Sequence, residues 1–274
     1  MEKLKIRGTL HSGCRSHASN FQADTNLSKM AYEDDCRDYF EYRASIEYDD
    51  HTYLHSQDEF ENDYDNDYDP DSDDDPDIAP EERIFYRGCR EGNMEQIHEM
   101  ITTGAIHLEK CGDSAIYNAS IRGKVDIIRY LRADQRVQPG DLSHLGFRMA
   151  SQEGHLGVVQ ALLEDSRIDP GCYRNDAIIN AASYGYYEMA RVLLADPRVD
   201  PTANDNMALY RSIIYGRADI LRLLLADARI DPTINIRSAI DSAVYYRHVD
   251  VINVLRNDPR LHDIVEEIAS CITK

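Results

Sequence analysis

Hydrophobic and polar positions recur in a fixed order from about residue 83 onward. Within 177–182, small and branched side chains stand at i, i+1, i+4 and i+5, which places them on one face of a helix. Gly185 follows, and glycine tolerates the positive φ of a tight turn. A second apolar stripe then occupies 189–194, with the acidic Glu188 in its first turn. The pattern predicts two amphipathic helices joined by a short turn.

The same order returns every 31 residues. The turn glycines are Gly92, Gly123, Gly154, Gly185 and Gly216, and the next step falls on Arg247. The same interval separates the prolines Pro139, Pro170, Pro201 and Pro232. It also separates Asp134, Asp165, Asp196, Asp227 and Asp258, each followed two positions later by Arg136, Arg167, Arg198, Arg229 or Arg260. Independent columns at one period indicate a repeat array.

A linker of the type D-P-R-V-D-P, at 196–201, closes each period. It ends the second helix, because a residue before proline is pushed out of the α region. A helical hairpin cannot cover its own apolar face, so neighbouring units must stack. We therefore predict an all-α repeat solenoid of helix-turn-helix units with short extended linkers. The expected units are 83–113 (degenerate), 114–144, 145–175, 176–206, 207–237 and 238–268, with a closing helix at 261–272.

The repeat resembles the ankyrin repeat. Residues 177–186 read A-I-I-N-A-A-S-Y-G-Y and are followed by Val192-Leu193-Leu194, against the family pattern T-P-L-H-x-A-A-x-x-G-H…V-x-L-L. Residues 149–163 match the G-H…V-V…L-L portion more fully. The resemblance covers 83 to about 268 and implies stacked ankyrin units that bind a protein partner without catalysis. Its D-P-R-V-D-P variant resembles ankyrin proteins of protists and large DNA viruses.

Three features depart from the family pattern. The period is shorter than the usual one of about 33 residues, which predicts shortened fingers in the linkers. The T-P-L-H tetrapeptide is absent, with Ile179, Tyr210 and Asp241 at its His position, so its capping and inter-repeat hydrogen bonds should be lost. Arg247 replaces the last turn glycine, which argues against a regular turn there.

Charge divides the chain into two parts. Residues 1–80 carry 22 Asp and Glu against 7 Lys and Arg, a net of −15 out of the total of −20. Such a segment cannot bury enough apolar surface to offset its ordering entropy. We predict a disordered acidic N-terminal tail at 1–80 and an ankyrin-repeat domain at 81–274. The excess of negative charge argues against direct nucleic-acid binding, since that requires Lys and Arg to displace counterions.

The chain shows no membrane or secretion signal. No apolar run approaches the ~18 residues that span a bilayer, and the first 17 residues lack an apolar signal core. Six scattered cysteines without a C-x-x-C pair favour free thiols in a reducing compartment. These features predict a monomeric intracellular protein of the cytoplasm or nucleus, in the host cell if the source is viral.

The resemblance also implies where a partner would bind: on the concave face, through the two residues before each turn glycine and nearby first-helix positions. Carried over by position, these are Tyr117, Ile121, Arg122, Gln152, Glu153, Ser183, Tyr184, Tyr210, Ile214, Tyr215, Tyr245 and Tyr246. The set becomes rich in tyrosine toward the last units. Tyrosine is favoured at interfaces because it offers a large apolar area and a hydroxyl at low entropic cost. The alternative is that these tyrosines only pack on adjacent repeats.

The arginine column has two interpretations. A ladder of five arginines could attract an acidic ligand, including the acidic tail of this chain as a weak competitor for the partner site. Alternatively, each arginine pairs with the Asp two residues earlier and closes its own linker. We favour the structural interpretation, since the Asp column accompanies every arginine.

No catalytic or metal-binding pattern is complete. The chain has no phosphate-binding glycine loop, nucleophile elbow or H-E-x-x-H motif, and we predict no enzymatic activity and no cofactor. Asp63, Asp65 and Asp67 begin like a calcium loop, but Tyr68 replaces its glycine. The His and Cys residues at 11–55 lack regular zinc spacing. The leading hypothesis is a protein-binding adaptor. The alternative is a regulatory or transcription-linked protein whose acidic aromatic tail is the effector and whose repeats are the anchor.

Overall fold

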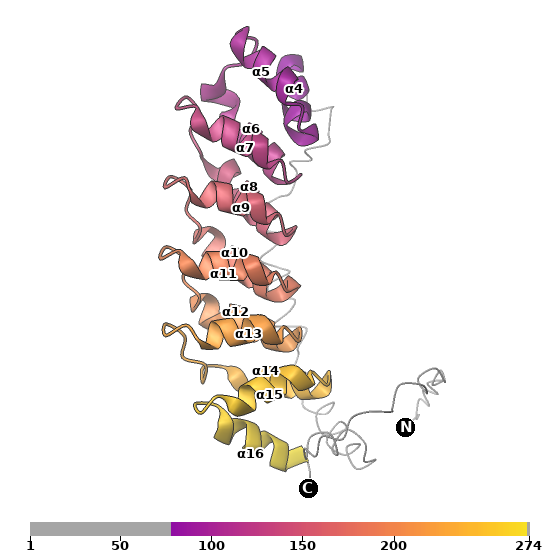
Figure 1. The fold of residues 1–274 in the computed structure, drawn as a ribbon, viewed down its shortest axis with the longest axis vertical. Helices are drawn as coiled ribbons and strands as arrows, with labels where there is room; N and C mark the ends of the chain where they lie inside the picture. Colours follow the sequence, from indigo (N-terminus) through magenta and orange to yellow (C-terminus); the bar gives the residue numbers. More distant parts are fainter. Residues whose placement is uncertain (1–77, 273–274) are drawn as a thin grey trace, which may run out of the picture. The chain divides into compact units, whose positions relative to one another are not determined.

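The computed structural model describes residues 78–272, which fold into thirteen α-helices without a strand in that range (Figure 1). The prediction of an all-α repeat solenoid is confirmed. Nearly all of the predicted acidic tail, with its calcium-like Asp series and its possible zinc ligands, lies outside the described residues.

Twelve of the helices form six hairpins, and a single helix comes after them (Figure 1). The hairpins are α4 (Pro80–Glu91) with α5 (Met94–Thr102), α6 (Leu108–Ser120) with α7 (Val125–Ala133), α8 (Asp141–Gln152) with α9 (Leu156–Leu163), α10 (Cys172–Tyr184) with α11 (Tyr187–Ala195), α12 (Ala203–Ile214) with α13 (Ala218–Leu225), and α14 (Ile236–Tyr245) with α15 (Val249–Asn257). The last helix is α16 (His262–Ile272).

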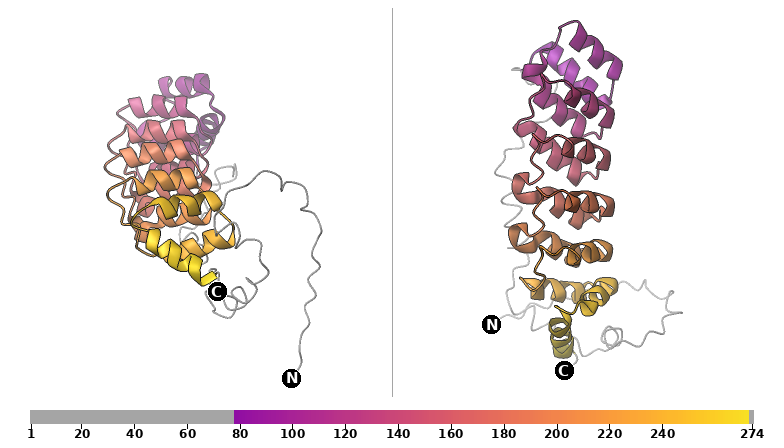
Figure 2. Two further views of the ribbon diagram at one scale, coloured as in Figure 1. Left: turned by 60° about the horizontal axis from the view of Figure 1, so that its bottom comes forward. Right: turned by 60° about the vertical axis from the view of Figure 1, so that its left-hand side comes forward.

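The hairpins stack so that their helices form two layers (Figure 2). The first helices α4, α6, α8, α10, α12 and α14 contact one another in succession, and we call them the first-helix layer. The second helices α7, α9, α11, α13 and α15 do the same on the other side. The predicted apolar stripes lie between the layers: Ala177, Ile178, Ala181 and Ala182 of α10 are buried, as are Met189, Ala190 and Leu193 of α11.

Two of the first helices begin with a left-handed turn. Residues 173–175 and 204–206 all have φ between 51° and 64°, so right-handed helix begins only at Asp176 and Met207. Asn175 and Asn206 suit such a backbone, because asparagine tolerates the left-handed region better than most residues. Both side chains also reach the next linker: Asn175 Oδ1 accepts from the Asp200 amide at 2.7 Å, and Asn206 Nδ2 donates to the Asp231 carbonyl at 2.7 Å.

These bonds take the place of those that the T-P-L-H motif would make. The first helices from α10 to α14 do lack a side-chain cap, as the absent T-P-L-H motif predicts. Inter-repeat hydrogen bonds are nevertheless present, because Asn175 and Asn206 supply them from a different position. His144 makes the corresponding bond in the preceding unit, where its Nε2 accepts from the Asp169 amide at 3.1 Å.

The turn glycines satisfy two requirements at once. Each has a positive φ, between 67° and 85°. In addition, a side chain from the next hairpin lies over the glycine: a Cβ on Gly154 would stand 2.8 Å from Tyr186 Cζ, and one on Gly216 would stand 2.8 Å from His248 Nδ1. The same side chains bind back to the preceding turn, since Tyr186 Oη donates to the Gln152 carbonyl at 3.3 Å and His248 Nε2 lies 2.9 Å from the Ile214 carbonyl.

The turn at Arg247 forms despite the missing glycine. Arg247 adopts a φ of 60°, and α14 and α15 pair as the other hairpins do. The expectation of an irregular turn is therefore wrong. The physical reason is that α15 is succeeded by the single helix α16 rather than by another hairpin, whose turn would lie over residue 247.

The single helix α16 covers the last hairpin. Leu261, Val265 and Ile268 are buried there, and Leu261 is fully inaccessible. Ion pairs join the helix to the hairpin, with Arg256 Nε 2.8 Å from Glu266 Oε1 and Arg237 Nη2 2.7 Å from Glu267 Oε2. A terminal helix with a polar outer side is what a repeat array needs in order to close its apolar core.

Candidate interaction surfaces

The Asp and Arg columns form a regular ladder along the linkers. In each unit the aspartate Oδ1 accepts from the backbone amide and the Nε of the arginine two residues later, and Oδ2 accepts from Nη2. The Nη2–Oδ2 distances are 2.6–2.7 Å. Such bidentate, charge-assisted bonds hold a guanidinium in one orientation.

The orientation directs the guanidinium onto the preceding unit. Nη1 donates to a linker carbonyl about one period earlier, from Arg167 to Val137 at 2.9 Å, from Arg198 to Ile168 at 2.9 Å and from Arg229 to Val199 at 2.8 Å. Nη2 of Arg198 and Arg260 also reaches the end of the preceding second helix. The ladder therefore joins neighbouring units, which supports its structural interpretation over that of a ligand site.

The ladder also shifts ionisation equilibria. Hydrogen bonds from the arginine side chain lower the pKa of all five aspartates, Asp134, Asp165, Asp196, Asp227 and Asp258, below the ordinary value. Burial acts on the pKa in the opposite direction but more weakly. The ladder is thus an ionised structural element at neutral pH.

Most of the predicted partner-binding residues reach the surface. Arg122, Glu153 and four tyrosines are exposed, and the accessible fractions of the tyrosines are 49% for Tyr184, 41% for Tyr215, 54% for Tyr245 and 61% for Tyr246. Ile121, Gln152, Ser183, Tyr210 and Ile214 are half-buried.

Tyr117 is the exception, because it is buried with 4% of its surface accessible. Gly146 explains the burial: without a side chain, α8 approaches α6 so closely that a Cβ on Gly146 would lie 3.1 Å from the Tyr117 Cα. The prediction that Tyr117 contacts a partner is wrong.

The exposed aromatic residues gather where the last three hairpins turn. We call residues 183–187, 214–218 and 245–249 the aromatic edge. Its rings contact one another: the Tyr184 and Tyr186 centroids are 5.8 Å apart and stacked, and Tyr245 and Tyr246 meet edge to face at 5.0 Å. The Arg211 guanidinium lies 5.8 Å from the Tyr215 ring centroid, and its Nη1 donates to Tyr215 Oη at 3.0 Å.

Part of this edge was not predicted from the sequence. Tyr187 and Val249 are exposed, with accessible fractions of 42% and 58%, although they follow the turn residue instead of preceding it. Tyr186 and His248 also belong to the edge, since His248 stacks on Tyr246 at 5.9 Å. Aromatic and histidine residues immediately after the turn position are the sequence signal that could have identified them.

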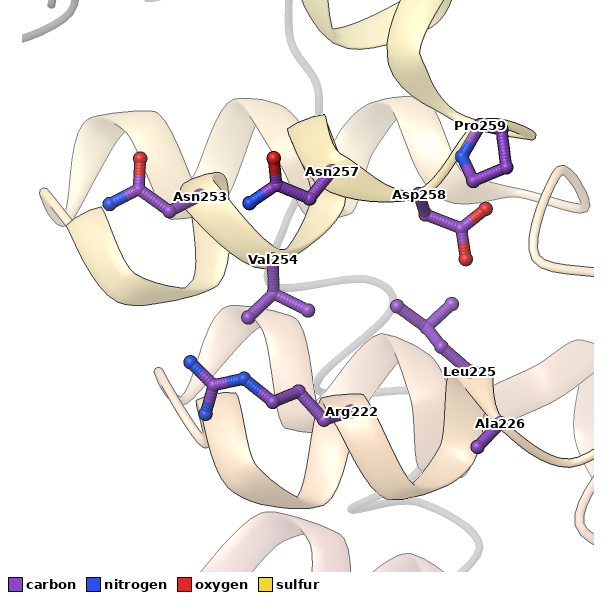
Figure 3. A pocket seen from close by; sticks show the side chains of 8 residues that line it. All are labelled: Arg222, Leu225, Ala226, Asn253, Val254, Asn257, Asp258 and Pro259. Atoms are coloured by element: carbon purple, nitrogen blue, oxygen red, sulfur yellow. The ribbon is translucent and has the colours of Figure 1, made fainter.

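The second helices carry a different feature, a shallow groove of about 400 Å³ between α13 and α15 (Figure 3). Val254 and Leu225 point toward one another across it, while Arg222, Asn253, Asn257 and Asp258 are its polar side chains (Figure 3). Asp258 is engaged with Arg260 in the ladder. The groove is open, and its ionisable side chains are not arranged as a general acid and base around a common point. It therefore offers contact area rather than a reaction site.

The thiols of Cys89 and Cys111 are buried, and that of Cys172 is half-buried. Desolvation raises the pKa of Cys89 to about 12 and that of Cys172 to about 12, and it also raises the pKa of Cys111. A thiol rather than a thiolate is a poor nucleophile and metal ligand. Among residues 78–272, no three His, Cys, Asp or Glu side chains gather in a way that could hold a metal ion.

Comparison with known families agrees with the hairpin geometry. The model for ankyrin repeats, in three copies, matches residues 147–236. Residues 147–236 are ankyrin repeats. The match extends from within α8 to the start of α14, so it covers the middle of the ankyrin stack. A search of curated proteins found no similar sequence.

Ankyrin repeats are in general protein–protein interaction modules, and their family is typically non-enzymatic. In the described part of this ankyrin chain, no helix has the length and apolar character needed to cross a bilayer.

Proposed function

We propose that this protein is an adaptor that binds a partner protein through the solvent side of its first-helix layer, with most of the contact on the aromatic edge. The observation that carries the proposal is the exposure of Tyr184, Tyr215, Tyr245 and Tyr246 on three successive hairpins. The same surface extends toward the N-terminal hairpins through Ile121, Arg122, Gln152 and Glu153, and on the later hairpins it includes Ser183, Tyr210 and Ile214.

The chemistry of the aromatic edge suits recognition. Exposed tyrosines leave water at little entropic cost on binding, because each has only two side-chain torsions, and they often dominate binding energy. The ring contacts among Tyr184, Tyr186, Tyr245 and Tyr246 restrict those torsions before any partner arrives. Pre-organisation of this kind reduces the cost of binding.

The Asp–Arg ladder, which follows the linkers at the opposite ends of the helices from the aromatic edge, supports the proposal because it holds the hairpins in place. Four of its five arginines, Arg167, Arg198, Arg229 and Arg260, donate to backbone carbonyls of the preceding unit. The spacing of the tyrosines is then set by the stack and does not depend on the partner. We infer that the protein is monomeric and intracellular. We also infer that its ligand is a protein, since the net charge of −20 opposes the binding of nucleic acid.

The test uses the full-length chain as bait in quantitative affinity capture, compared with a variant carrying Tyr215→Ala, Tyr245→Ala and Tyr246→Ala. The amount of each specific partner captured should fall at least tenfold with the triple variant, while the circular dichroism spectrum of the protein remains unchanged. Ile234→Ala is the matched control, because Ile234 is similarly exposed at 45% but lies in a linker away from the aromatic edge. Equal capture by the triple variant would show that the edge is not the binding surface.

A further inference from the structure

We propose that the partner segment bound at the aromatic edge is an uncharged, proline-rich peptide in the polyproline II conformation. It lies along the stack with one proline against each of Tyr184, Tyr215 and Tyr246. The inference rests on the proposed function, because it takes the aromatic edge as the binding surface. It adds the chemical class of the ligand, its conformation and the path that it follows.

The three tyrosines form a row with one ring on each of the last three hairpins. Tyr184, Tyr215 and Tyr246 each stand directly before the turn position, so they are 31 residues apart in the sequence. Stacked helices are about 8–10 Å apart, and equivalent backbone positions of successive hairpins are separated by about this distance. In the second and third hairpins the same position holds Arg122 and Glu153. The row is therefore confined to the last three hairpins.

A polyproline II helix repeats at the same spacing. It has three residues per turn and rises about 3.1 Å per residue, so one side of the peptide recurs every ~9.3 Å. Prolines at the first, fourth and seventh positions span about 19 Å, and two steps between hairpins span about 16–20 Å. The side chains on one face of a β-strand recur every ~6.8 Å and do not match the row. The spacing therefore favours proline at every third residue.

Each ring of the row is held by a neighbouring side chain of its own hairpin. The pairs are Tyr184 with Tyr186, Tyr215 with Arg211, and Tyr246 with His248, at 5.8, 5.8 and 5.9 Å from the ring centroid to the partner's ring centroid or guanidinium carbon. The tyrosines of the row nevertheless remain 41–61% accessible. A polyproline II helix is itself preformed, so neither side loses much conformational entropy on binding.

A groove of about 500 Å³ adjoins the row. Its lining includes Gly185 and Gly216, which directly follow the first two tyrosines of the row, and Asp250 of α15. The groove thus involves the same three hairpins, which succeed one another along the stack (Figure 1). Four of the nine lining residues are charged. An amphipathic helix needs a continuous apolar groove, so this one suits a peptide with an exposed polar backbone better.

The charges of the groove select an uncharged ligand. Arg217 and Arg222 line it together with Asp219 and Asp250, so their formal charges cancel. Arg222 also pairs with Asp219 at 2.6 Å. An acidic peptide would meet the aspartates and a basic peptide would meet the arginines, and like charges at an interface oppose binding. A neutral proline-rich segment avoids both penalties.

The aromatic edge also offers the hydrogen-bond donors that such a segment requires. The carbonyls of a polyproline II helix have no internal partners, and proline has no N–H of its own. Tyr215 Oη accepts from Arg211 Nη1 at 3.0 Å, which leaves the tyrosine's own hydrogen to donate. Tyr187 lines the groove, is 42% accessible and carries a second hydroxyl. Hydroxyls beside the rings can therefore bind the carbonyls of the ligand.

The experiment measures binding of a fluorescein-labelled peptide, Ala-Pro-Pro repeated three times, to the full-length protein by fluorescence anisotropy. The peptide should bind saturably, and Ala-Ser-Gly repeated three times should not. Tyr184→Ala, Tyr215→Ala and Tyr246→Ala should each lower the affinity at least fivefold, whereas Ile234→Ala should leave it unchanged. Between about 0.05 and 0.5 M salt the affinity should change by twofold or less, since no net charge is involved.

A lengthened row gives a gain-of-binding test. Glu153 is exposed, ends α8 in a right-handed helical conformation and stands one period before Tyr184, so Glu153→Tyr adds a fourth ring to the row. A peptide with four Ala-Pro-Pro repeats should bind this variant at least fivefold more tightly than the wild type. The peptide with three repeats should gain twofold or less, because it reaches only three rings at a time.

Three outcomes would overturn the inference: no saturation at millimolar peptide, equal affinities for the tyrosine variants and the wild type, or a tenfold loss of affinity in high salt. If the captured partners still depend on the tyrosines but the proline peptide neither binds nor displaces them, the proposed function stands and only the class of ligand is wrong. If capture is also independent of the tyrosines, both proposals fail.

Discussion

The residue at the turn of each hairpin is constrained both by its own backbone conformation and by a side chain of the next hairpin. Gly154 and Gly216 must adopt a positive φ, and they must also admit the ring of Tyr186 or His248 from the next hairpin. Arg247 meets only the first requirement, because α16 comes after it as a single helix. From the sequence, the repeated glycines indicate a turn in each hairpin. The structure shows that they also indicate that the next hairpin packs a side chain over that turn.

Gly216→Ala should therefore lower the free energy of unfolding by more than the cost of a positive φ alone. The left-handed backbone costs an L-residue about 1–2 kcal/mol, and displacement of the His248 ring adds about 1–3 kcal/mol. Arg247→Gly should instead raise the free energy of unfolding by about 0.5–1 kcal/mol, since it relieves the φ strain without a packing change. Denaturant unfolding monitored by circular dichroism measures both, and stabilisation by Gly216→Ala would refute this account of the turn.

The ladder arginines should differ in their importance. Arg198 donates to Asp196 and to the carbonyls of Ile168 and Leu163, whereas the bonds of Arg136 go to Asp134 of its own linker. Arg198→Gln leaves carbonyls of the preceding unit without their donor and should cost about 2–3 kcal/mol. Arg136→Gln should cost below about 1 kcal/mol, as exposed pairs do. Equal unfolding midpoints for the two variants would show that the inter-unit bonds carry no weight.

At the scale of the helices, the 31-residue period predicts much of the fold. It places the buried stripes of α10 and α11, the turn after Tyr184 and the stacking of hairpins, because each follows from local spacing and from the need to cover an apolar face. It cannot predict how closely two helices approach. The burial of Tyr117 depends on Gly146 of another unit, and the period alone does not report such a contact.

The candidate site was predictable to a similar degree. Exposure of Tyr215, Tyr245 and Tyr246 follows from their place before the turn. The contribution of Tyr186 and His248 does not, since it arises from their reach across to the preceding hairpin. The hydrogen bonds of Asn175 and Asn206 were equally hidden, because they depend on a left-handed turn at the start of two helices.

The terminal helix gives a test at this scale. Leu261 is fully buried next to α16, so Leu261→Ala should cost about 2–4 kcal/mol locally. In a repeat array each unit contacts only its neighbours, and the loss should stay near the end of the stack. Hydrogen exchange should accelerate in α14, α15 and α16 and remain unchanged in α6 and α8. Uniform acceleration throughout the stack would mean that the array unfolds as a single cooperative unit.

For the whole molecule, the ladder fixes how stability depends on pH. Arginine hydrogen bonds lower the pKa of five aspartates in the folded state, so the unfolded chain binds protons first as the pH falls. Their stabilisation is complete above the ordinary value near 3.9 and is lost as the pH falls through the lower folded values. We expect a nearly constant ladder contribution from pH 7 to 5 and a steep loss of stability below about pH 4. Asp196→Asn should lower the free energy of unfolding at pH 7 and make its decrease below about pH 4 shallower. If the free energy of unfolding, measured against pH, gives parallel curves for the variant and the wild type, the ladder is not the cause of the acid loss.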